Sequence, residues 1–439
     1  MNPYIQYMYS YPHKTAYGVL SGIRLEDYAK RLVAGDNSLY FHIPFCQSKC
    51  GYCNLFSVTG QSEAFMKEYV DAMERQAQQV ARIFPESVQF SDLTLGGGTP
   101  LALPTGQLER VFEIAEKIMG FDAGDKMIIV ETSPGQTTEE KLRLLKEHSV
   151  TRISMGVQSF QEEELKRLNR SHSVAQVEQA MTWIRRMGFP CVNLDLIYGI
   201  PGQTIESLLA SAKRVLEYEP EELFVYPLYI KKDTYLSGKK LNRSEYTYEM
   251  YLQIRDYLKD RGYVPCSMRR FVRGGSPSDT GSCGFDNTIS LGCGGRSYIG
   301  NLHFCTPYGV RQSQCMSILR EYMEQQNYLD ITHGYLLSED EEKRRYVIKN
   351  ILFSSGLSLE EYGQVYGSRP EEDYPILADW IRDGYAFVNH MRMYLTEKGI
   401  SLSDYLGPML ISKEVREKMC RSEISPLSII DEEGKEGRI

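Results

Sequence analysis

The stretch YFHIPFCQSKCGYC, residues 40–53, ends a short apolar run with three cysteines. The run from Leu39 to Ile43 predicts a buried strand. Cys46, Cys50 and Cys53 follow it with C-x3-C-x2-C spacing, among small or flexible neighbours that let a loop wrap around an inorganic core. Parallel α/β domains place their chemistry at the C-terminal ends of strands, so this stretch indicates both the fold and the place of the site.

Downstream of this stretch, short apolar runs alternate with longer amphipathic segments. The predicted strands are 39–43, 93–95, 127–131, 152–156, 192–196 and 223–228, and the predicted helices are 64–83, 107–118, 139–147, 174–187 and 205–218. Strands joined by helical crossovers form a parallel sheet. The sequence therefore predicts an α/β fold, a partial (β/α)6 TIM-like barrel.

Several of these strands end in glycine or polar residues. The first runs into Cys46, the second into Gly96–Gly97–Gly98–Thr99, and the third into Glu131, while Asp195 lies within the fifth. Because the C-terminal ends of parallel strands meet at one edge, we expect these residues to share one site.

The chain divides into three expected parts: a tyrosine-rich arm at 1–37, the barrel domain with an extension at 38–310, and a C-terminal domain at 311–439. The segment GGSPSDTGSCGF at 274–285 indicates a loop. Beyond residue 311 the pattern is mainly helical, and 384–399 indicates a β-hairpin, which together predict a winged-helix-like domain. We expect the arm to pack against the mouth of the barrel.

Composition excludes several classes of partner. With 50 basic and 58 acidic residues among 439, the net charge is −8, which does not attract phosphate backbones, so we expect no nucleic-acid partner. We find no signal-peptide pattern and no apolar run long enough for a membrane span, and we expect a cytoplasmic protein without membrane contact. In a reducing compartment, clustered thiols more often bind metal or do redox chemistry than form disulfides.

The three clustered cysteines suit an iron-sulfur cluster, whereas a structural zinc site normally takes four ligands. A [4Fe-4S] cluster held by three cysteines leaves one iron open to a small molecule. A buried trio of unligated cysteines is the alternative interpretation of the spacing.

Taken together, the motifs resemble the radical S-adenosylmethionine (SAM) enzymes, and among them the HemN-type group like oxygen-independent coproporphyrinogen III oxidase. The resemblance covers roughly Leu39 to Asn301 and rests on YFHIPFCQSKCGYC, LGGGTP, Glu131, GVQSF, LNRSH, NLDLIYGIPGQT and LGCGGRSYIG. It implies a [4Fe-4S] cluster on Cys46, Cys50 and Cys53, whose open iron binds SAM. It also implies an electron donor such as flavodoxin or ferredoxin, and a small-molecule substrate from which a 5′-deoxyadenosyl radical abstracts hydrogen.

The resemblance further implies two SAM positions. The matched contacts of the first are Tyr40, Gly97 and Glu131, and those of the second are Tyr52, Gly98, Thr99, Gln158, Arg170 and Asp195. Residue chemistry agrees, since glycine lets the backbone approach a ligand and arginine can hold a carboxylate in a bidentate pair. Two SAM molecules favour C-methylation or alkylation of an unknown substrate.

The sequence departs from the family pattern at two places. Leu55 stands where coproporphyrinogen oxidases of this group carry a further cysteine, which argues against porphyrinogen decarboxylation. The His-Asn…Tyr-Trp signature of haem-chaperone relatives is replaced around Gly284, Phe285, Asp286 and Asn287, which argues against haem delivery. Oxidative decarboxylation, haem breakdown with methyl transfer and a haem-chaperone role remain the alternatives.

Two further groups of residues carry weaker expectations. Cys283, Cys293, Cys305 and Cys315 lie within about thirty residues of one another, and we expect buried free thiols there rather than an auxiliary cluster. Arg269 and Arg270 precede the loop, and we expect a solvated charge pair rather than ligands of a carboxylated substrate.

Overall fold

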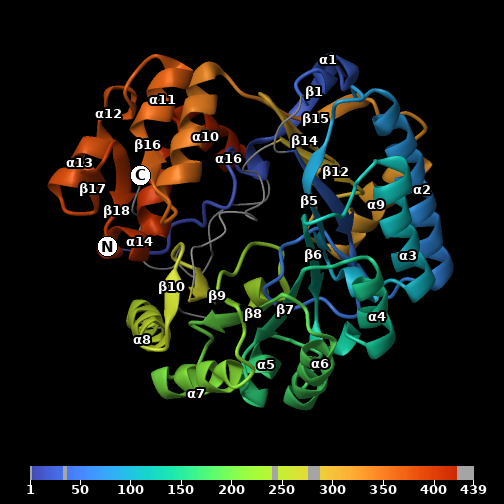
Figure 1. Ribbon diagram of the computed structural model, residues 1–439, viewed down its shortest axis with the longest axis horizontal. Helices are drawn as coiled ribbons and strands as arrows, with labels where there is room; N and C mark the ends of the chain where they lie inside the picture. The colour runs from blue at the N-terminus through green and yellow to red at the C-terminus, as the bar shows by residue number, and fades with distance from the viewer. Residues whose placement is uncertain (1, 33–36, 240–245, 275–286, 423–439) are drawn as a thin grey trace.

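The computed structural model describes residues 2–32, 37–239, 246–274 and 287–422 (Figure 1). A sheet of 13 strands, in the order β1-β15-β14-β13-β12-β2-β5-β6-β7-β8-β9-β11-β10, runs through the larger part of the molecule. Its ends are formed by β1 and β10, so the sheet is open, as expected for a partial barrel.

The six predicted strands form the centre of this sheet. They are β2 (Asn37–Ile43), β5 (Phe90–Gly97), β6 (Met127–Thr132), β7 (Arg152–Gln158), β8 (Cys191–Tyr198) and β9 (Glu222–Pro227). Each pairs in parallel with the next in chain order. The parallel α/β core is thereby confirmed, and the C-terminal ends of all six strands face the same edge.

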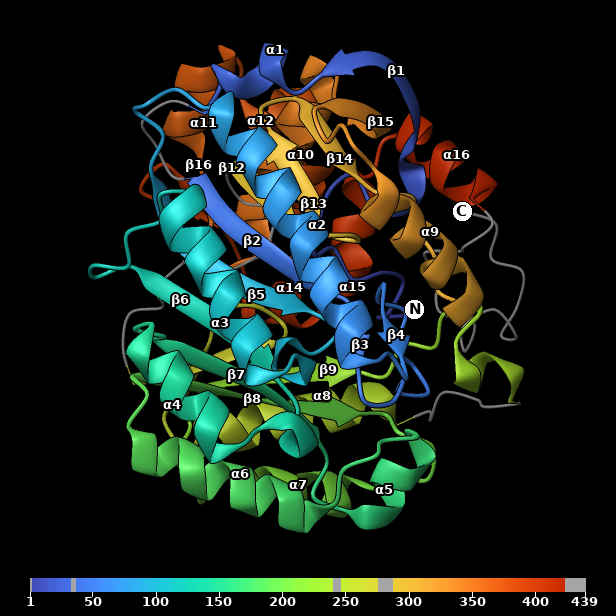
Figure 2. The same ribbon diagram turned by 90° about the vertical axis from the view of Figure 1, so that its right-hand side faces the viewer.

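Helices connect these strands and lie side by side over the outer face of the sheet (Figure 2). They are α2 (Glu63–Arg82), α3 (Thr105–Glu113) continued by a π-helical turn at Ile114–Ile118, α4 (Glu139–Glu147), α5 (Glu162–Arg167), α6 (Val174–Met187) and α7 (Ile205–Leu216). Hydroxyl N-caps begin four of them: Ser62, Thr138, Ser173 and Thr204 each accept a hydrogen bond from a backbone N–H of the first turn.

Further strands extend the sheet on both sides of the parallel core. β12 (Asn287–Leu291) pairs in parallel with β2, and β13 (Arg296–Ile299), β14 (Leu302–Cys305), β15 (Asp330–Leu336) and β1 (Gly18–Arg24) follow as antiparallel strands. On the other side, β11 (Arg270–Arg273) pairs antiparallel with β9, and β10 (Tyr263–Pro265) pairs with β11 and forms the edge of the sheet. The domain boundary at residue 310 remains a prediction, although the sheet itself continues as far as β15.

Helices α8 (Thr247–Lys259) and α9 (Gln312–Glu324) flank the sheet, and α1 (Glu26–Ala29) follows β1. The C-terminal region, whose ribbon is orange and red in Figure 1, has its own hydrophobic cluster, to which the N-terminal arm contributes Met8, Tyr11, Ala16 and Tyr17. It contains α10 (Glu339–Ile351), α11 (Leu359–Tyr366), α12 (Pro370–Asp373), α13 (Ile376–Arg382), α14 (Glu397–Ser401), α15 (Ser403–Leu406) and α16 (Lys413–Arg421). The predicted hairpin is present as β17 (Ala386–Asn389) and β18 (Arg392–Leu395), with β16 (Leu357–Ser358) as a third strand.

The N-terminal arm lies across the barrel and joins it to the C-terminal region. The Tyr4 hydroxyl donates to the Thr247 carbonyl at 3.2 Å, and the rings of Tyr7 and Tyr226 lie 6.4 Å apart. The backbone N–H of Gln6 donates to the Asp404 carbonyl at 3.1 Å. The arm therefore packs on the barrel, as its tyrosine content predicts.

Two sequence expectations fall outside the described residues. The loop predicted at 274–285 is described only at Gly274, and the altered haem-chaperone signature only at Asn287, which begins β12. No helix within the described ranges is long and apolar enough to span a bilayer.

Candidate functional site

The three motif cysteines lie on one loop at the C-terminal end of β2. Cys46 ends the short strand β3 (Phe45–Cys46), which pairs with β4 (Val58–Thr59), and Cys50 and Cys53 lie between these strands. Gly51 anchors the loop, because its N–H donates to the Leu168 carbonyl and its carbonyl accepts from Leu236, both at 2.8 Å. A Cβ at Gly51 would lie 2.8 Å from Cγ of Leu236, so the close packing requires glycine.

The thiols of this loop influence one another. Burial and the neighbouring Cys53 raise the pKa of Cys46 to about 12, and burial together with Cys50 raises the pKa of Cys53. The guanidinium of Arg170 donates from Nη1 to Sγ of Cys50 at 2.9 Å. In the described chain, no three His, Cys, Asp or Glu side chains are gathered as a ready metal site. The donor set nevertheless fits an iron-sulfur cluster, because the three half-buried cysteines lie on one loop, the Arg170 guanidinium donates to one of them, and thiolates are the ligands of such clusters.

The glycines after β5 bring backbone against this loop. Gly98 donates its N–H to the Ile43 carbonyl at 2.8 Å, and a Cβ at Gly98 would lie 2.7 Å from the Phe45 carbonyl and 3.0 Å from Sγ of Cys46. Gly97 has φ +113°, a conformation that favours glycine. The backbone therefore forms a cradle beside the cysteines that any side chain would fill.

Glu131, at the end of β6, lies across this cradle. Its Oε2 accepts the N–H of Gly97 at 3.2 Å, and a Cβ at the preceding Gly96 would lie 2.9 Å from Glu131 and 3.0 Å from the Tyr40 hydroxyl. Burial raises the pKa of Glu131 to about 7, with the carboxylate of Asp195 adding to the effect. Tyr40, Gly97 and Glu131, the predicted contacts of the first SAM, are thus brought together.

Asp195 on β8 lies near the same edge. Asn193 donates to its Oδ1 at 2.8 Å, and burial raises the pKa of Asp195 to about 6. Two carboxylates with raised pKa on β6 and β8, on either side of β7 in one parallel sheet, are typical of a functional site.

The other residues predicted for the second SAM gather beside Asp195. Gln158 ends β7 with φ +72°, a strained conformation for a residue with a side chain, and its buried Oε1 has no hydrogen-bond partner among the described residues. Arg170 donates to the Gly156 carbonyl, while its buried Nε lacks a partner in the same described set. Burial raises the pKa of Tyr52, which also interacts with the charges of Arg170 and Asp195. Unsatisfied buried polar atoms of this kind fit a polar ligand.

Thr99, predicted for the same position, lies against the cysteine loop. Its hydroxyl donates to Sγ of Cys46 at 3.8 Å, and its N–H donates to the Phe45 carbonyl at 2.8 Å. The cysteine loop and the predicted SAM contacts are therefore neighbours. The assignment of individual residues to the cluster and to two SAM molecules stays a prediction.

His42 is a site residue that the sequence analysis did not single out, although it lies inside the decisive motif. Its ring lies directly beside the backbone of Gly97, its Nδ1 is 3.3 Å from the Tyr40 hydroxyl, and its Nε2 is 3.0 Å from the Phe56 carbonyl. Burial lowers the pKa of His42 to about 4, so the ring is neutral and holds Tyr40 in place.

The expectation for Arg269 and Arg270 was wrong, because both side chains are buried and paired. Arg269 forms an ion pair with Asp404 of the C-terminal region, and its guanidinium lies 3.7 Å from the ring centre of Tyr7. Arg270 binds Glu222 at 2.5 Å. Their acidic partners are remote in sequence, so local composition gave no sign of the pairing.

The remaining cysteines are free thiols in the described residues. Cys293 donates to the Thr306 hydroxyl at 3.6 Å, and Sγ of Cys305 lies 4.0 Å from Nδ1 of His333. Cys315 is buried, and Cys283 falls outside the described residues.

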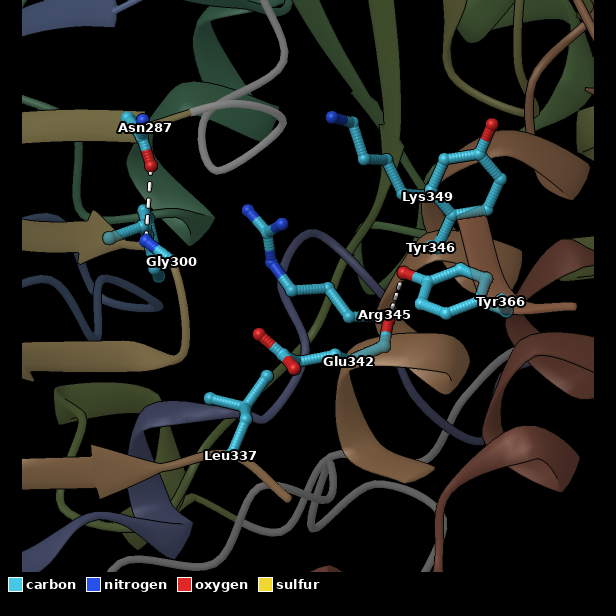
Figure 3. Close-up of a pocket in the computed structure, with 9 residues that line it drawn as sticks. Asn287, Gly300, Leu337, Glu342, Arg345, Tyr346, Lys349 and Tyr366 are labelled. Carbon is cyan, nitrogen blue, oxygen red and sulfur yellow. Dashed lines mark hydrogen bonds between the residues drawn. The ribbon is translucent and has the colours of Figure 1, made fainter. Parts of the chain in front are cut away.

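A pocket of about 400 Å³ lies away from the cysteine loop, between the sheet and the C-terminal region (Figure 3). Arg345 and Lys349 of α10 line it opposite Asn287 and Gly300. None of the predicted site residues lines this pocket. A second pocket of about 210 Å³, lined by Lys14, Tyr308 and His333 among others, is closer to the site, because the Tyr308 hydroxyl donates to the Asn54 carbonyl at 2.5 Å.

Comparisons with known proteins find similar sequences and a similar fold. The family model described as "Radical SAM superfamily" matches residues 40–215. Heme chaperone HemW of Bacillus subtilis is 27% identical over 373 residues, which cover 82% of this chain and 96% of that protein. Oxygen-independent coproporphyrinogen III oxidase of Escherichia coli is 27% identical over 388 residues, which cover 82% of each chain.

The fold also matches a solved structure, that of coproporphyrinogen III oxidase (HemN) from Escherichia coli, with a TM-score of 0.78 at 24% identity over 92% of this chain and 96% of that one. This likeness extends well beyond the six parallel strands. The chain therefore matches the radical SAM family model over residues 40–215, and over most of its length it is similar to HemW and to oxygen-independent coproporphyrinogen III oxidase and has the fold of HemN.

Proposed function

We propose that this protein is an enzyme that reductively cleaves SAM and uses the resulting radical to abstract hydrogen from a carbon of a small-molecule substrate. The observation that carries the proposal is the contact between the cysteine loop and the glycine cradle, with Gly98 against Cys46 and Glu131 on the adjoining Gly97. Thiol donors, a backbone without side chains beside them and a partly buried carboxylate are what a cluster and a bound SAM require.

When bound, a [4Fe-4S] cluster supplies the electron that splits the sulfonium of SAM into methionine and a 5′-deoxyadenosyl radical. Cys46, Cys50 and Cys53 would hold three of its irons. Glu131 would accept hydrogen bonds from the ribose hydroxyls of SAM. The neutral His42 ring keeps the Tyr40 hydroxyl near the same position.

A second SAM would be held by the polar residues at the ends of β7 and β8. The unpartnered oxygen of Gln158 can accept from an ammonium group, and Asp195 can accept from an ammonium or hydroxyl group. Arg170 can hold a carboxylate. These assignments are supported by the buried Gln158, the half-buried Arg170 and Asp195, and the contact of Arg170 with Cys50 of the cysteine loop.

The substrate would enter under the N-terminal arm, where the pocket at Lys14 lies beside the cysteine loop. The Nζ of Lys14 lies 3.4 Å from the ring centre of Tyr308 and makes no hydrogen bond or ion pair within the described residues. Burial lowers the pKa of Lys14 well below its usual range. A buried amine of this kind is stabilised when an anionic group enters beside it.

Among reactions that begin with hydrogen abstraction, an oxidation that needs no molecular oxygen has the best support, because relatives named oxygen-independent coproporphyrinogen III oxidase match 82% of the chain. Methyl transfer has less support, since these relatives are named as an oxidase and a heme chaperone. Leu55 is 46% exposed where the oxidases carry a cysteine, so we do not extend the oxidase's substrate to this protein.

The first experiment measures SAM cleavage. Protein reconstituted anaerobically with iron and sulfide is incubated with dithionite and SAM, and 5′-deoxyadenosine and methionine are quantified by mass spectrometry. We expect both products from the native protein and from Cys420→Ala, whose thiol is exposed and remote in the chain, and neither from Cys50→Ala. Equal product formation by Cys50→Ala would contradict the proposal.

A haem-binding role is the second candidate, favoured by the relatives named heme chaperone HemW. Titration with hemin, followed by absorbance, tests it. Stoichiometric haem binding with no 5′-deoxyadenosine under reducing conditions would favour this role over the enzyme.

A further inference from the structure

A buried asparagine two residues earlier on β8 holds the Asp195 carboxylate. Successive side chains of a strand point to opposite faces, so Asn193 and Asp195 lie on the same face of the sheet. The Asn193 side chain is 1% exposed, and its Nδ2 donates to Oδ1 of Asp195 and to Oγ of Ser154, both at 2.8 Å. Ser154 is the register partner of Asn193 on β7. One amide group therefore ties the Asp195 carboxylate to the neighbouring strand.

The Asn193 amide serves Asp195 at the expense of its own oxygen. Both hydrogens of Nδ2 are donated to side-chain oxygens, while the buried Oδ1 has no hydrogen-bond partner within the described part of the chain. A buried acceptor without a partner destabilises a protein. An asparagine that served the fold alone would be satisfied at both ends of its amide, so this arrangement favours a role in the site.

Charged and titratable groups from several neighbouring elements also act on Asp195. Burial raises its pKa to about 6, and the donation from Asn193 and the charges of Arg152 and Arg170 oppose this rise. Arg152 is itself held by an ion pair with Glu222 at 2.5 Å. The groups that interact with Asp195 are Glu131 of β6, Arg152 of β7, Arg170 after α5, Glu222 and Tyr226 of β9, and Tyr52 of the cysteine loop. Asn193 adds a direct hydrogen bond, which fixes the orientation of the carboxylate as well as its charge.

We propose that Asn193 is a positioning residue of the candidate site, which holds the Asp195 carboxylate in the orientation that accepts an ammonium or hydroxyl group of the ligand. Ser154 in turn fixes the Asn193 amide. The inference rests on the proposed function, in which Asp195 belongs to the second SAM position. Asn193 acts on the ligand only through Asp195.

The test is a double-mutant cycle on SAM binding. Asn193→Leu and Asn193→Ala both remove the donor but differ in volume, so an effect that they share comes from the lost hydrogen bond rather than from packing. Each is combined with Asp195→Ala. The control Asn350→Leu removes a similar donation, from Asn350 Nδ2 to the Tyr346 carbonyl at 2.7 Å, on α10 of the C-terminal region. Equilibrium dialysis of the anaerobically reconstituted protein gives the number of SAM molecules bound and the dissociation constant of each.

We expect the dissociation constant of the second SAM to rise about tenfold in Asn193→Leu and in Asn193→Ala, because the carboxylate is then free to turn away from the ligand. Asp195→Ala alone should weaken the second SAM about tenfold or more. Adding Asn193→Leu to Asp195→Ala should change the constant less than about twofold, because the group through which Asn193 acts is gone. Binding of the first SAM, and both constants in Asn350→Leu, should match the native protein.

The pH profile separates a positioning role from a merely structural one. In the native protein, binding of the second SAM should weaken as the pH falls below about 6, where Asp195 takes up a proton. Because the hydrogen bond from Asn193 favours the ionised carboxylate, its loss in Asn193→Leu should move this midpoint upward by about one pH unit. In Asp195→Ala this step of the profile should be absent, with or without Asn193.

Additive effects, in which the double variant loses about a hundredfold in affinity, would overturn the positioning role. So would native affinity in Asn193→Leu and Asn193→Ala, or a midpoint that Asn193→Leu leaves unchanged. If Asn193→Leu does not fold, Asn193→Ala carries the same comparisons. A native protein that binds only one SAM would overturn the second position of the proposed function and the inference with it, whereas the other outcomes overturn the inference alone.

Discussion

The substitution Glu131→Gln tests whether the carboxylate at the end of β6 is kept for a ligand at the expense of stability. Burial raises its pKa from the usual 4.5 to about 7. At about 1.4 kcal/mol per tenfold change in the proton equilibrium, the ionised carboxylate costs the folded protein about 3 kcal/mol at pH 8. A glutamine side chain at this position would accept the Gly97 N–H less strongly than the carboxylate does. The weaker hydrogen bond would lower the stability of the variant by about 1 kcal/mol. The variant should therefore be about 2 kcal/mol more stable at pH 8.

The sign of the pH dependence follows from the raised pKa. Below pH 4.5 the carboxyl group is protonated in both the folded and the unfolded protein, and its ionisation costs nothing. Between pH 4.5 and 7 the folded protein binds more protons than the unfolded chain, so stability falls as pH rises through this window. The advantage of Glu131→Gln should grow across the same window and level off above pH 7.

Urea unfolding of the cluster-free protein, followed by circular dichroism at pH 5 and pH 8, measures this difference. Although Glu131→Gln should stabilise the protein, it should weaken SAM binding. We expect the SAM affinity of the reconstituted variant to fall about tenfold or more, because SAM loses a hydrogen bond to the charged Glu131 carboxylate. Glu140→Gln, an exposed position on α4, should change neither quantity.

Destabilisation by Glu131→Gln at pH 8 together with unchanged SAM affinity would refute this reasoning. It would mean that the carboxylate serves the fold rather than the ligand.

Three further substitutions test the packing around the site. Gly98→Ala places a Cβ 2.7 Å from the Phe45 carbonyl, so we expect a folded protein by circular dichroism that incorporates far less than the native iron content after reconstitution; full iron incorporation would contradict the cradle. Arg269→Met leaves the buried Asp404 without its cation and should lower the free energy of unfolding by about 3 kcal/mol, with much of the loss recovered in Arg269→Met/Asp404→Leu. Ser173→Ala removes the N-cap of α6 and should cost about 1 kcal/mol in urea unfolding without affecting SAM binding.

The parallel core could be predicted from the sequence because its strands are buried on both faces and therefore read as continuous apolar runs. The strands that extend the sheet gave no such signal. β1 is exposed along most of its length, with Val19 89% exposed, and it pairs with β15 about three hundred residues later. Neither an apolar run nor a short turn marks a strand of this kind.

Site residues could be predicted from the sequence where a motif fixes the course of the backbone. They could not be predicted where contacts between distant parts of the chain determine what a side chain pairs with. Cys46, Gly98 and Glu131 come together because they end adjacent parallel strands. Arg269 needed Asp404, 135 residues away, and that pairing follows from how the C-terminal region packs on the barrel. His42 was visible in the motif, but only its contact with Gly97 shows that it supports the cradle.

The central claim is that three cysteines hold a [4Fe-4S] cluster with one iron open to SAM. Electron paramagnetic resonance of the anaerobically reconstituted, dithionite-reduced protein, recorded with and without SAM, tests it most directly. We predict a reduced-cluster signal whose g values shift when SAM is added. A signal that SAM leaves unchanged, or a protein that holds zinc and gives no such signal, would contradict the account.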